Sequence, residues 1–175
     1  MSIIATYVRL DANGLDKCRE NPHWLEALCR KEIPGVELID IDKACDGLVW
    51  VLERMPAPAP QAVEGAGFVL QSSLASLLQG GTVEERRLKA PYGPASRLSP
   101  QDVAALSAWL QAIDADLMRS RYNAAAMDAE EVYPEIWSEE GLAAFDDYLM
   151  PYFQNLQAFF LRAAEAQQHV LVCFT

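Results

Sequence analysis

The sequence predicts a single α+β domain, residues 1–175, in which a small sheet that includes the N- and C-terminal strands is covered by several helices. Apolar and β-branched segments stand at both ends of the 175 residues, and apolar residues recur at helical spacing between them. About half of the chain is apolar (51%), which suffices for a core without a disulfide or a metal. The absence of internal repeats favours one domain.

The first segment, residues 2–10, alternates β-branched and other apolar side chains, so we expect a strand with both faces covered. Asn21 can then cap a helix whose first position is Pro22. The spacing predicts this helix over about 22–32, and Pro34 and Gly35 should stop it.

The next predicted helix begins with Asp40 as its cap and ends near Arg54. A single buried stripe supports it, formed by Ile41, Cys45, Leu48, Val49 and Leu52. Leucine spacing predicts a further helix over 68–79, followed by a charged connector over 82–89 and an extended segment over 92–98.

Ser99, Pro100 and Asp102 mark the clearest helix start in the chain, and the helix should run to about residue 113. Short helical segments are expected at 115–122 and around 124–127.

The helices should be interrupted at Val132, Tyr133 and Pro134, because helical geometry is disfavoured for a residue that precedes proline. Ser138 is then expected to cap a long closing helix that reaches about Gln167 and bends at Pro151. Residues 169–175 read as a final buried strand that shares a sheet with the first one.

The chain is acidic, with 14 basic and 25 acidic residues, a formal charge of −11 and an isoelectric point near 4.5. This argues against nucleic acids and anionic membranes as partners, because both attract basic surfaces. No membrane span is expected, since prolines and glycines break the longest nearly uncharged segment, residues 55–83. The first residues lack a secretory signal pattern, so we expect a cytoplasmic protein.

Metal and cofactor chemistry finds little support in the residue pattern. The four cysteines form no Cys-x-x-Cys pair, and only His23 and His169 are present to complete a zinc site. We therefore expect no metal and no cofactor, and we interpret the cysteines as reduced, mostly buried thiols. No activated serine or cysteine motif is present, so we assign no catalytic residue and favour a protein that is not an enzyme.

The chain resembles the YfbM-like family, a domain of unknown function that is widespread among bacteria. Besides the terminal segments, four blocks carry the resemblance: LIDIDKACDGLVWVLE at 38–53, GGTVEE at 80–85, YGPASRLSPQDVAALSAWL at 92–110 and EVYPEIW at 131–137. The resemblance spans nearly the whole chain and implies a shared fold. It implies no reaction or cofactor, because none is established for the family.

The first block departs from the family pattern, which is of the form D-K-x-W-H-x-L-H. Cys45 stands at the tryptophan position, and Asp46 and Val49 stand at the two histidine positions. Any chemistry that depends on those histidines is therefore absent from this chain.

A candidate pocket is formed by Asp40, Asp42, Lys43 and Asp46, which gather three carboxylates and an ammonium within two helical turns. One hypothesis is a small hydrolase or transferase that uses Asp42 and Asp46 near Tyr133. It requires these groups and a histidine to converge in a concave pocket. The simpler interpretation, in which Asp40 caps the helix and Asp42 favours its positive end, is the preferred one.

Acidic residues are concentrated in the last third of the chain, where residues 114–175 carry 11 acids and 3 bases, a net −8 of the total −11. We predict a protein-binding domain that docks a basic partner here, such as an immunity protein that neutralises a basic toxin enzyme. The predicted contact residues flank an aromatic anchor at Tyr133 or Trp137; they are Asp128, Glu130, Glu131, Tyr133, Glu135, Trp137, Glu139 and Glu140. A solubilising acidic face is the alternative.

Overall fold

A computed structural model describes residues 3–56, 74–80, 84–90 and 93–175. Its centre is a five-stranded antiparallel sheet with the strand order β2-β1-β5-β4-β3. The strands are β1 (Ala5–Leu10), β2 (Leu38–Asp40), β3 (Glu84–Ala90), β4 (Gly93–Leu98) and β5 (His169–Phe174). The predicted class, a single α+β domain, is confirmed.

The two strands from the ends of the domain lie side by side, as the sequence predicts. β5 pairs with β1 along its whole length, from Ala5 opposite Phe174 to Leu10 opposite His169. The other edge of β5 pairs with β4, so the final strand lies in the middle of the sheet. Both of its faces are covered, and residues 170–173 are all buried.

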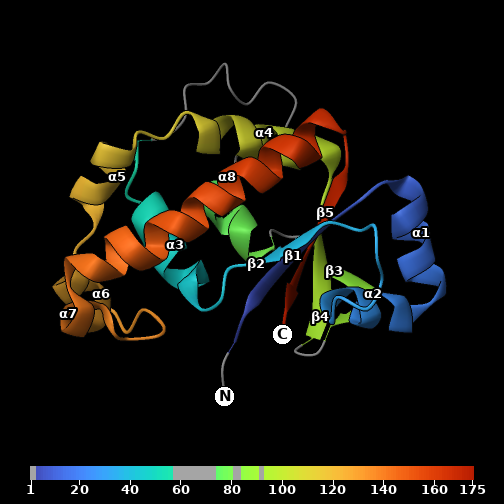
Figure 1. Cartoon of the computed structure of the whole chain (residues 1–175), viewed down its shortest axis with the longest axis horizontal. Coiled ribbons are helices and arrows are strands. Elements are labelled where there is room, and N and C mark those ends of the chain that lie inside the picture. Colours follow the sequence, from blue (N-terminus) through green and yellow to red (C-terminus); the bar gives the residue numbers. More distant parts are fainter. Residues whose placement is uncertain (1–2, 57–73, 81–83, 91–92) are drawn as a thin grey trace.

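Helices cover both faces of the sheet, and the alternation of side chains along the strands assigns each residue to one layer (Figure 1). Tyr7 and Val172 belong to the larger core, which they share with α3 (Ala44–Leu52), α4 (Pro100–Gln111) and α8 (Met150–Glu165). Val8 and Leu171 point to the other face and form a smaller core with α1 (Ala12–Glu20) and α2 (Pro22–Cys29). The sheet is thus the middle of three layers.

The smaller layer begins with a helix that the sequence analysis missed. Asp11 caps α1 by accepting a hydrogen bond of 2.7 Å from the backbone N–H of Gly14. Only Leu15 and Cys18 bury apolar side chains from this helix, which is too few to show a helical period. Asn21 caps α2 as predicted, by accepting from the N–H of His23 at 3.2 Å.

The segment around Asp40 differs from the prediction. Residues Leu38–Asp40 form β2, at the edge of the sheet, and α3 begins only at Ala44. Asp40 therefore caps no helix. Asp42 has a φ of +47°, which lies outside helical geometry, so Asp42 and Asp46 are not paired on one helical face.

The connector expected over 82–89 is also wrong where the structure describes it, because residues Glu84–Ala90 form the edge strand β3. The expected helix over 68–79 lies partly outside the described residues. Within them, Leu74–Gln79 form the 3₁₀ helix η2. The extended segment predicted over 92–98 agrees with β4 from Gly93 onward.

The helices of the central part agree with their sequence signals. Ser99 and Asp102 form a reciprocal capping box at the start of α4, with the Ser99 N–H donating to Asp102 at 2.9 Å. The two short helices that follow are α5 (Ala115–Arg121) and α6 (Ala124–Ala129).

The predicted closing helix is divided rather than continuous. A short helix, α7 (Trp137–Glu140), ends at Gly141, whose φ is +61°. The π-helix η3 (Ala144–Leu149) then leads into α8, and the Met150 N–H donates to the carbonyl of Phe145. Pro151 follows directly; because proline cannot continue the regular hydrogen-bond ladder, the wider π turn accommodates it. Ser138 is not the cap, since it lies within α7, whose N-cap is Ile136; the Ser138 N–H donates to Asp128.

No helix in the described ranges is both long and apolar enough to cross a membrane. Cys18, Cys45 and Cys173 are buried free thiols, and Cys29 is a half-buried one. Burial is the main cause of the raised pKa of the Cys18 and Cys45 thiols, which is about 12 for each.

Candidate functional site

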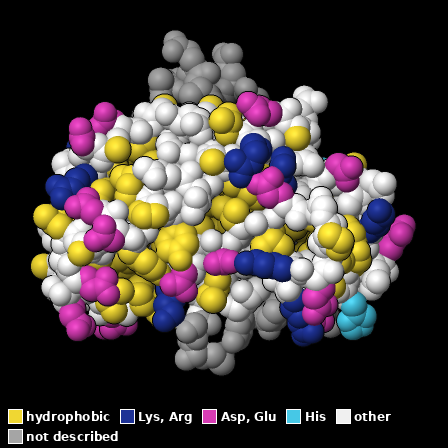
Figure 2. Space-filling model, viewed as in Figure 1, with side chains coloured by type: hydrophobic (Ala, Val, Ile, Leu, Met, Phe, Trp, Pro, Cys, Tyr) yellow, Lys and Arg dark blue, Asp and Glu magenta, His cyan; other side chains and the backbone are white. Residues whose placement is uncertain are grey.

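Acidic side chains gather at the end of the molecule formed by α5, α6 and α7, as Figure 2 shows. The predicted contact residues lie on α6, on α7 and on the loop between them. They do not all face the solvent, and their contacts divide them into a supporting set and an exposed set.

Asp128 and Glu130 belong to the supporting set. Asp128 accepts hydrogen bonds from the backbone N–H groups of Trp137 (3.2 Å) and Ser138 (2.8 Å), and the bonds from Ser138 hold the pKa of its carboxyl below the ordinary value. Glu130 accepts from the Trp50 indole at 2.7 Å and from Arg54 at 3.0 Å. These two carboxylates therefore fix the ends of α6 and α7 to each other and to α3.

Trp137 is fully buried, so the prediction that it could serve as a surface anchor is wrong. Its indole N–H donates to the carbonyl of Val132 at 2.7 Å, and Tyr122 packs edge-on against its ring. The Tyr122 hydroxyl donates to Gly141 at 2.8 Å and so holds the end of α7. Trp137 supports the surface from below, and its amphipathic character gave no signal of which side it would face.

The exposed set forms what we name the α6–α7 surface: Glu131, Tyr133, Glu135, Glu139, Glu140 and Leu142. Its four carboxylates are exposed, and none forms an ion pair with another described residue. Tyr133 is half-buried, and Leu142 is 54% exposed. The surface thus combines unpaired negative charge with apolar contact area.

The second candidate group is Asp40, Asp42, Lys43 and Asp46, and its members have separate hydrogen-bond partners. Asp42 accepts from the Tyr148 hydroxyl at 2.9 Å, whereas Asp46 accepts from Gln79 at 3.0 Å. Asp40 pairs with Lys31 at 3.1 Å, and only the backbone N–H of Lys43 has a partner here, the Tyr148 oxygen at 3.1 Å. Each carboxylate is thus held by a different group.

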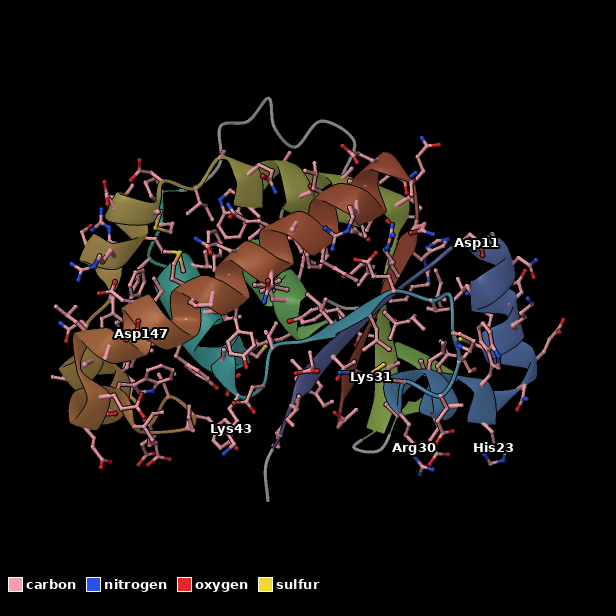
Figure 3. The ribbon with its side chains drawn as sticks, in the orientation of Figure 1. Asp11, His23, Arg30, Lys31, Lys43 and Asp147 are labelled. Carbon is pink, nitrogen blue, oxygen red and sulfur yellow. The ribbon has the colours of Figure 1, made fainter. Side chains whose placement is uncertain are left out.

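The convergence that a hydrolase or transferase would need is not found among the described residues. His23 is exposed, pairs with Glu26 and lies far from Lys43 (Figure 3). His169 contacts Arg97 instead, with 3.5 Å between the ring Nδ1 and the guanidinium. Among all the residues that the structure describes, no group of three or more His, Cys, Asp or Glu side chains has an arrangement suited to a metal ion.

A polar cleft of about 780 Å³ lies at the opposite end of the molecule, beside the start of α1, where Figure 3 labels Asp11. Residues from β1, α1, α2 and the loop before β2 line it, together with one residue that precedes β5; among them are Arg9, Lys17, Trp24, Ile33, Glu37 and Gln168. The sequence analysis missed this cleft because its lining comes from scattered positions without a motif.

Glu37 organises the wall of this cleft. Its carboxylate accepts from Arg9 at 2.6 Å and from Arg162 at 2.5 Å. The hydrogen bonds of Arg162, and after them those of Arg9, hold the pKa of the Glu37 carboxyl below its ordinary value of 4.5. The charge of Glu37 is thereby offset by two guanidinium groups.

Fold and sites together define a single-domain α+β protein with an acidic surface at one end and a charged cleft at the other. The chain belongs to a family described as a domain of unknown function, DUF1877, whose model matches residues 1–173. The resemblance to the YfbM-like family is thus confirmed.

A solved structure with a similar fold is YfbM from Escherichia coli, a protein of unknown function. The two chains are 19% identical and superpose with a TM-score of 0.68, over 98% of this chain and 99% of YfbM. This similarity extends to the fold alone. A comparison with curated proteins found no match.

Proposed function

We propose that this protein is a binding protein that docks a basic protein partner on the α6–α7 surface. One observation carries the proposal: four exposed carboxylates without ion-pair partners among the described residues lie along the same short segment as the exposed Leu142 and the half-buried Tyr133. Protein interfaces commonly combine a few apolar or aromatic anchors with a charged rim.

The charge distribution supports a basic partner. Unpaired carboxylates on one end of an acidic protein attract cationic surfaces and accelerate their association, and salt screens this attraction. Tyr133 and Leu142 take the role of anchors, because Trp137 is fully buried. An immunity protein that neutralises a basic toxin enzyme is the class of binding protein that we propose.

The supporting residues make the surface well suited to docking. Asp128 ties the start of α7 to α6, and Tyr122 ties its end to the core. The exposed glutamates therefore project from a fixed backbone, which reduces the conformational entropy lost when a partner binds.

The test is capture of a partner from the native host at low salt, with the product of the neighbouring gene examined first. Charge reversal of Glu131, Glu135 and Glu139 to Lys should weaken the complex at least about tenfold and reduce its salt dependence. The matched control reverses Glu20, Glu32 and Glu165, three exposed acids outside the α6–α7 surface, and should leave the affinity within about twofold.

Two results would refute the proposal. One is the failure to capture any basic protein at low salt. The other is a complex whose affinity and salt dependence respond equally to the two triple reversals, since net charge alone would then explain the binding.

A further inference from the structure

The cleft beside α1 differs from the rest of this acidic molecule in its local charge. Arg9, Lys17 and the adjacent Arg162 supply three cations, and Asp11 and Glu37 supply two carboxylates. Both carboxylates are already engaged: Asp11 caps α1 through Gly14, and Glu37 binds the two arginines. Two cations and two carboxylates thus line the cleft, with Arg162 beside it, so its walls are neutral overall in a protein whose formal charge is −11.

Lys17 is the cation best placed to meet an incoming group. Its side chain is exposed at the cleft, and its ammonium lies 5.7 Å from the centre of the Trp24 ring. It forms no ion pair with a described carboxylate. A cation above an aromatic ring keeps its hydrogen-bond donors available, because the ring accepts none of them strongly.

Arg9 is fixed in place and still lacks acceptors. It donates to Glu37, to Gln168 at 3.1 Å and to the carbonyl of Arg162 at 3.2 Å. Its Nε–H is buried and has no hydrogen-bond partner in the described structure. A guanidinium has five N–H donors, and besides this buried Nε–H the three bonds leave one Nη2–H of Arg9 without a described partner.

The remaining lining combines the polar Asn13 and Gln168 with an apolar part. Trp24, Ile33 and Val36 are each only partly buried and pack against the smaller core. The volume of about 780 Å³ lies within the range of sites that bind small organic molecules. Apolar walls beside two cations suit a compact ligand that has one acidic group and a flat apolar body.

We propose that this cleft binds a small aromatic acid, with its anionic group between Lys17 and Arg9 and its ring system against Trp24 and Ile33. The site lies at the other end of the molecule from the α6–α7 surface, so the proposal is independent of protein docking. Variants of the cleft are expected to leave the capture of a protein partner unchanged.

The test uses 2-naphthoate as the probe and nuclear magnetic resonance of the full chain as the readout. Titration should shift the amide signals of Gly14 and Gly35 and the indole N–H signal of Trp24, because all three residues line the cleft. The neutral analogue 2-naphthamide should bind at least about fivefold more weakly, the effect of losing one exposed ion pair.

Lys17→Met should weaken the binding of 2-naphthoate by about the same fivefold. It should leave the binding of 2-naphthamide unchanged, since the substitution removes only a charge. The matched control is Lys43→Met, a lysine far from the cleft whose side chain has no described partner. Because Lys17 is exposed, its variant should keep the unfolding midpoint of the parent.

Three outcomes would overturn the proposal. They are the absence of shifts at the cleft with several millimolar probe, equal affinity for the acid and the amide, and equal effects of the Lys17 and Lys43 substitutions. Trp24→Leu gives a second check, because it should weaken both probes through lost ring contact.

Discussion

Glu37 shows how a single carboxylate can join distant parts of a chain. Its side chain binds Arg9 of β1 and Arg162 of α8, and its carbonyl accepts the Arg9 backbone N–H at 3.2 Å. The loop before β2 is thereby fixed to the sheet and to α8. With 32% of the side chain exposed, solvent screens part of each ion pair, and the stabilisation is accordingly modest.

Glu37→Gln should lower the free energy of unfolding at pH 7 by about 1 kcal/mol. The folded pKa of Glu37 lies below 4.5, so its carboxylate stabilises the folded state above the unfolded pKa and this contribution disappears as the pH falls through the folded pKa. The difference between parent and variant should therefore vanish below that range. Urea unfolding at several pH values measures it, with the exposed Glu32→Gln as the control. A difference that is constant with pH would contradict the linkage.

Gly47 in α3 is a position where the Trp137 side chain of α7 approaches the α3 backbone closely. A Cβ there would lie 2.8 Å from Cζ2 of Trp137, a distance that real contacts do not tolerate. The glycine thus allows α7 to rest on α3 through the tryptophan ring, and this contact places the α6–α7 surface.

Gly47→Ala should destabilise the protein by about 1 to 3 kcal/mol through overpacking, even though alanine favours helices by about 1 kcal/mol. Trp137→Leu is itself destabilising because it empties a buried site, but in that background Gly47→Ala should cost much less, because the smaller side chain removes the clash. A double-mutant cycle followed by thermal unfolding measures the coupling. A coupling energy near zero, or a more stable single variant, would refute this account of the contact.

The elements that were predicted correctly are those whose local signals agree with their packing. The capping box at Ser99 and Asp102 and the Asn21-Pro22 start both mark real helices. The missed strands lie at the two edges of the sheet: β2 has only three residues, and β3 reads EERRLKA, a charged sequence with little alternation. Edge strands receive their hydrogen bonds from one neighbour only, and their sequences carry a weak apolar pattern.

The candidate sites show a similar division. Composition alone located the acidic third of the chain, but the division into supporting and exposed residues needed the structure, since Asp128 and Glu139 look alike in sequence. The cleft depends on the meeting of residues 9–37 with Gln168, which no spacing could indicate. Long-range pairing between β1 and β5 creates this meeting.

At the level of the complete domain, stability should depend on β5 more than on any other strand. Among the described strands, it alone joins the pair β2-β1 to the pair β4-β3, and it contributes to both cores. Its loss would expose apolar surface on both faces of the sheet.

Deletion of residues 169–175 should abolish cooperative unfolding, as measured by circular dichroism on heating. Deletion of Thr175 alone is the matched control, because it removes only the pair of backbone hydrogen bonds with Ile4 and the side-chain contact with Thr6, and it should leave a cooperative transition. If the longer deletion keeps a cooperative transition and the parental helical signal, the role assigned to β5 is wrong.

The central position of β5 also sets the order of events while the chain is being synthesised. Thr6 and Thr175 lie 169 residues apart and contact each other in the finished domain. The ribosome delivers β1 to β4 first, yet these strands form two separate pairs until β5 has emerged to join them. Nearly all of the domain must therefore wait with unfinished strand edges, which exposes it to chaperones, and the high sequence separation of its contacts slows its folding.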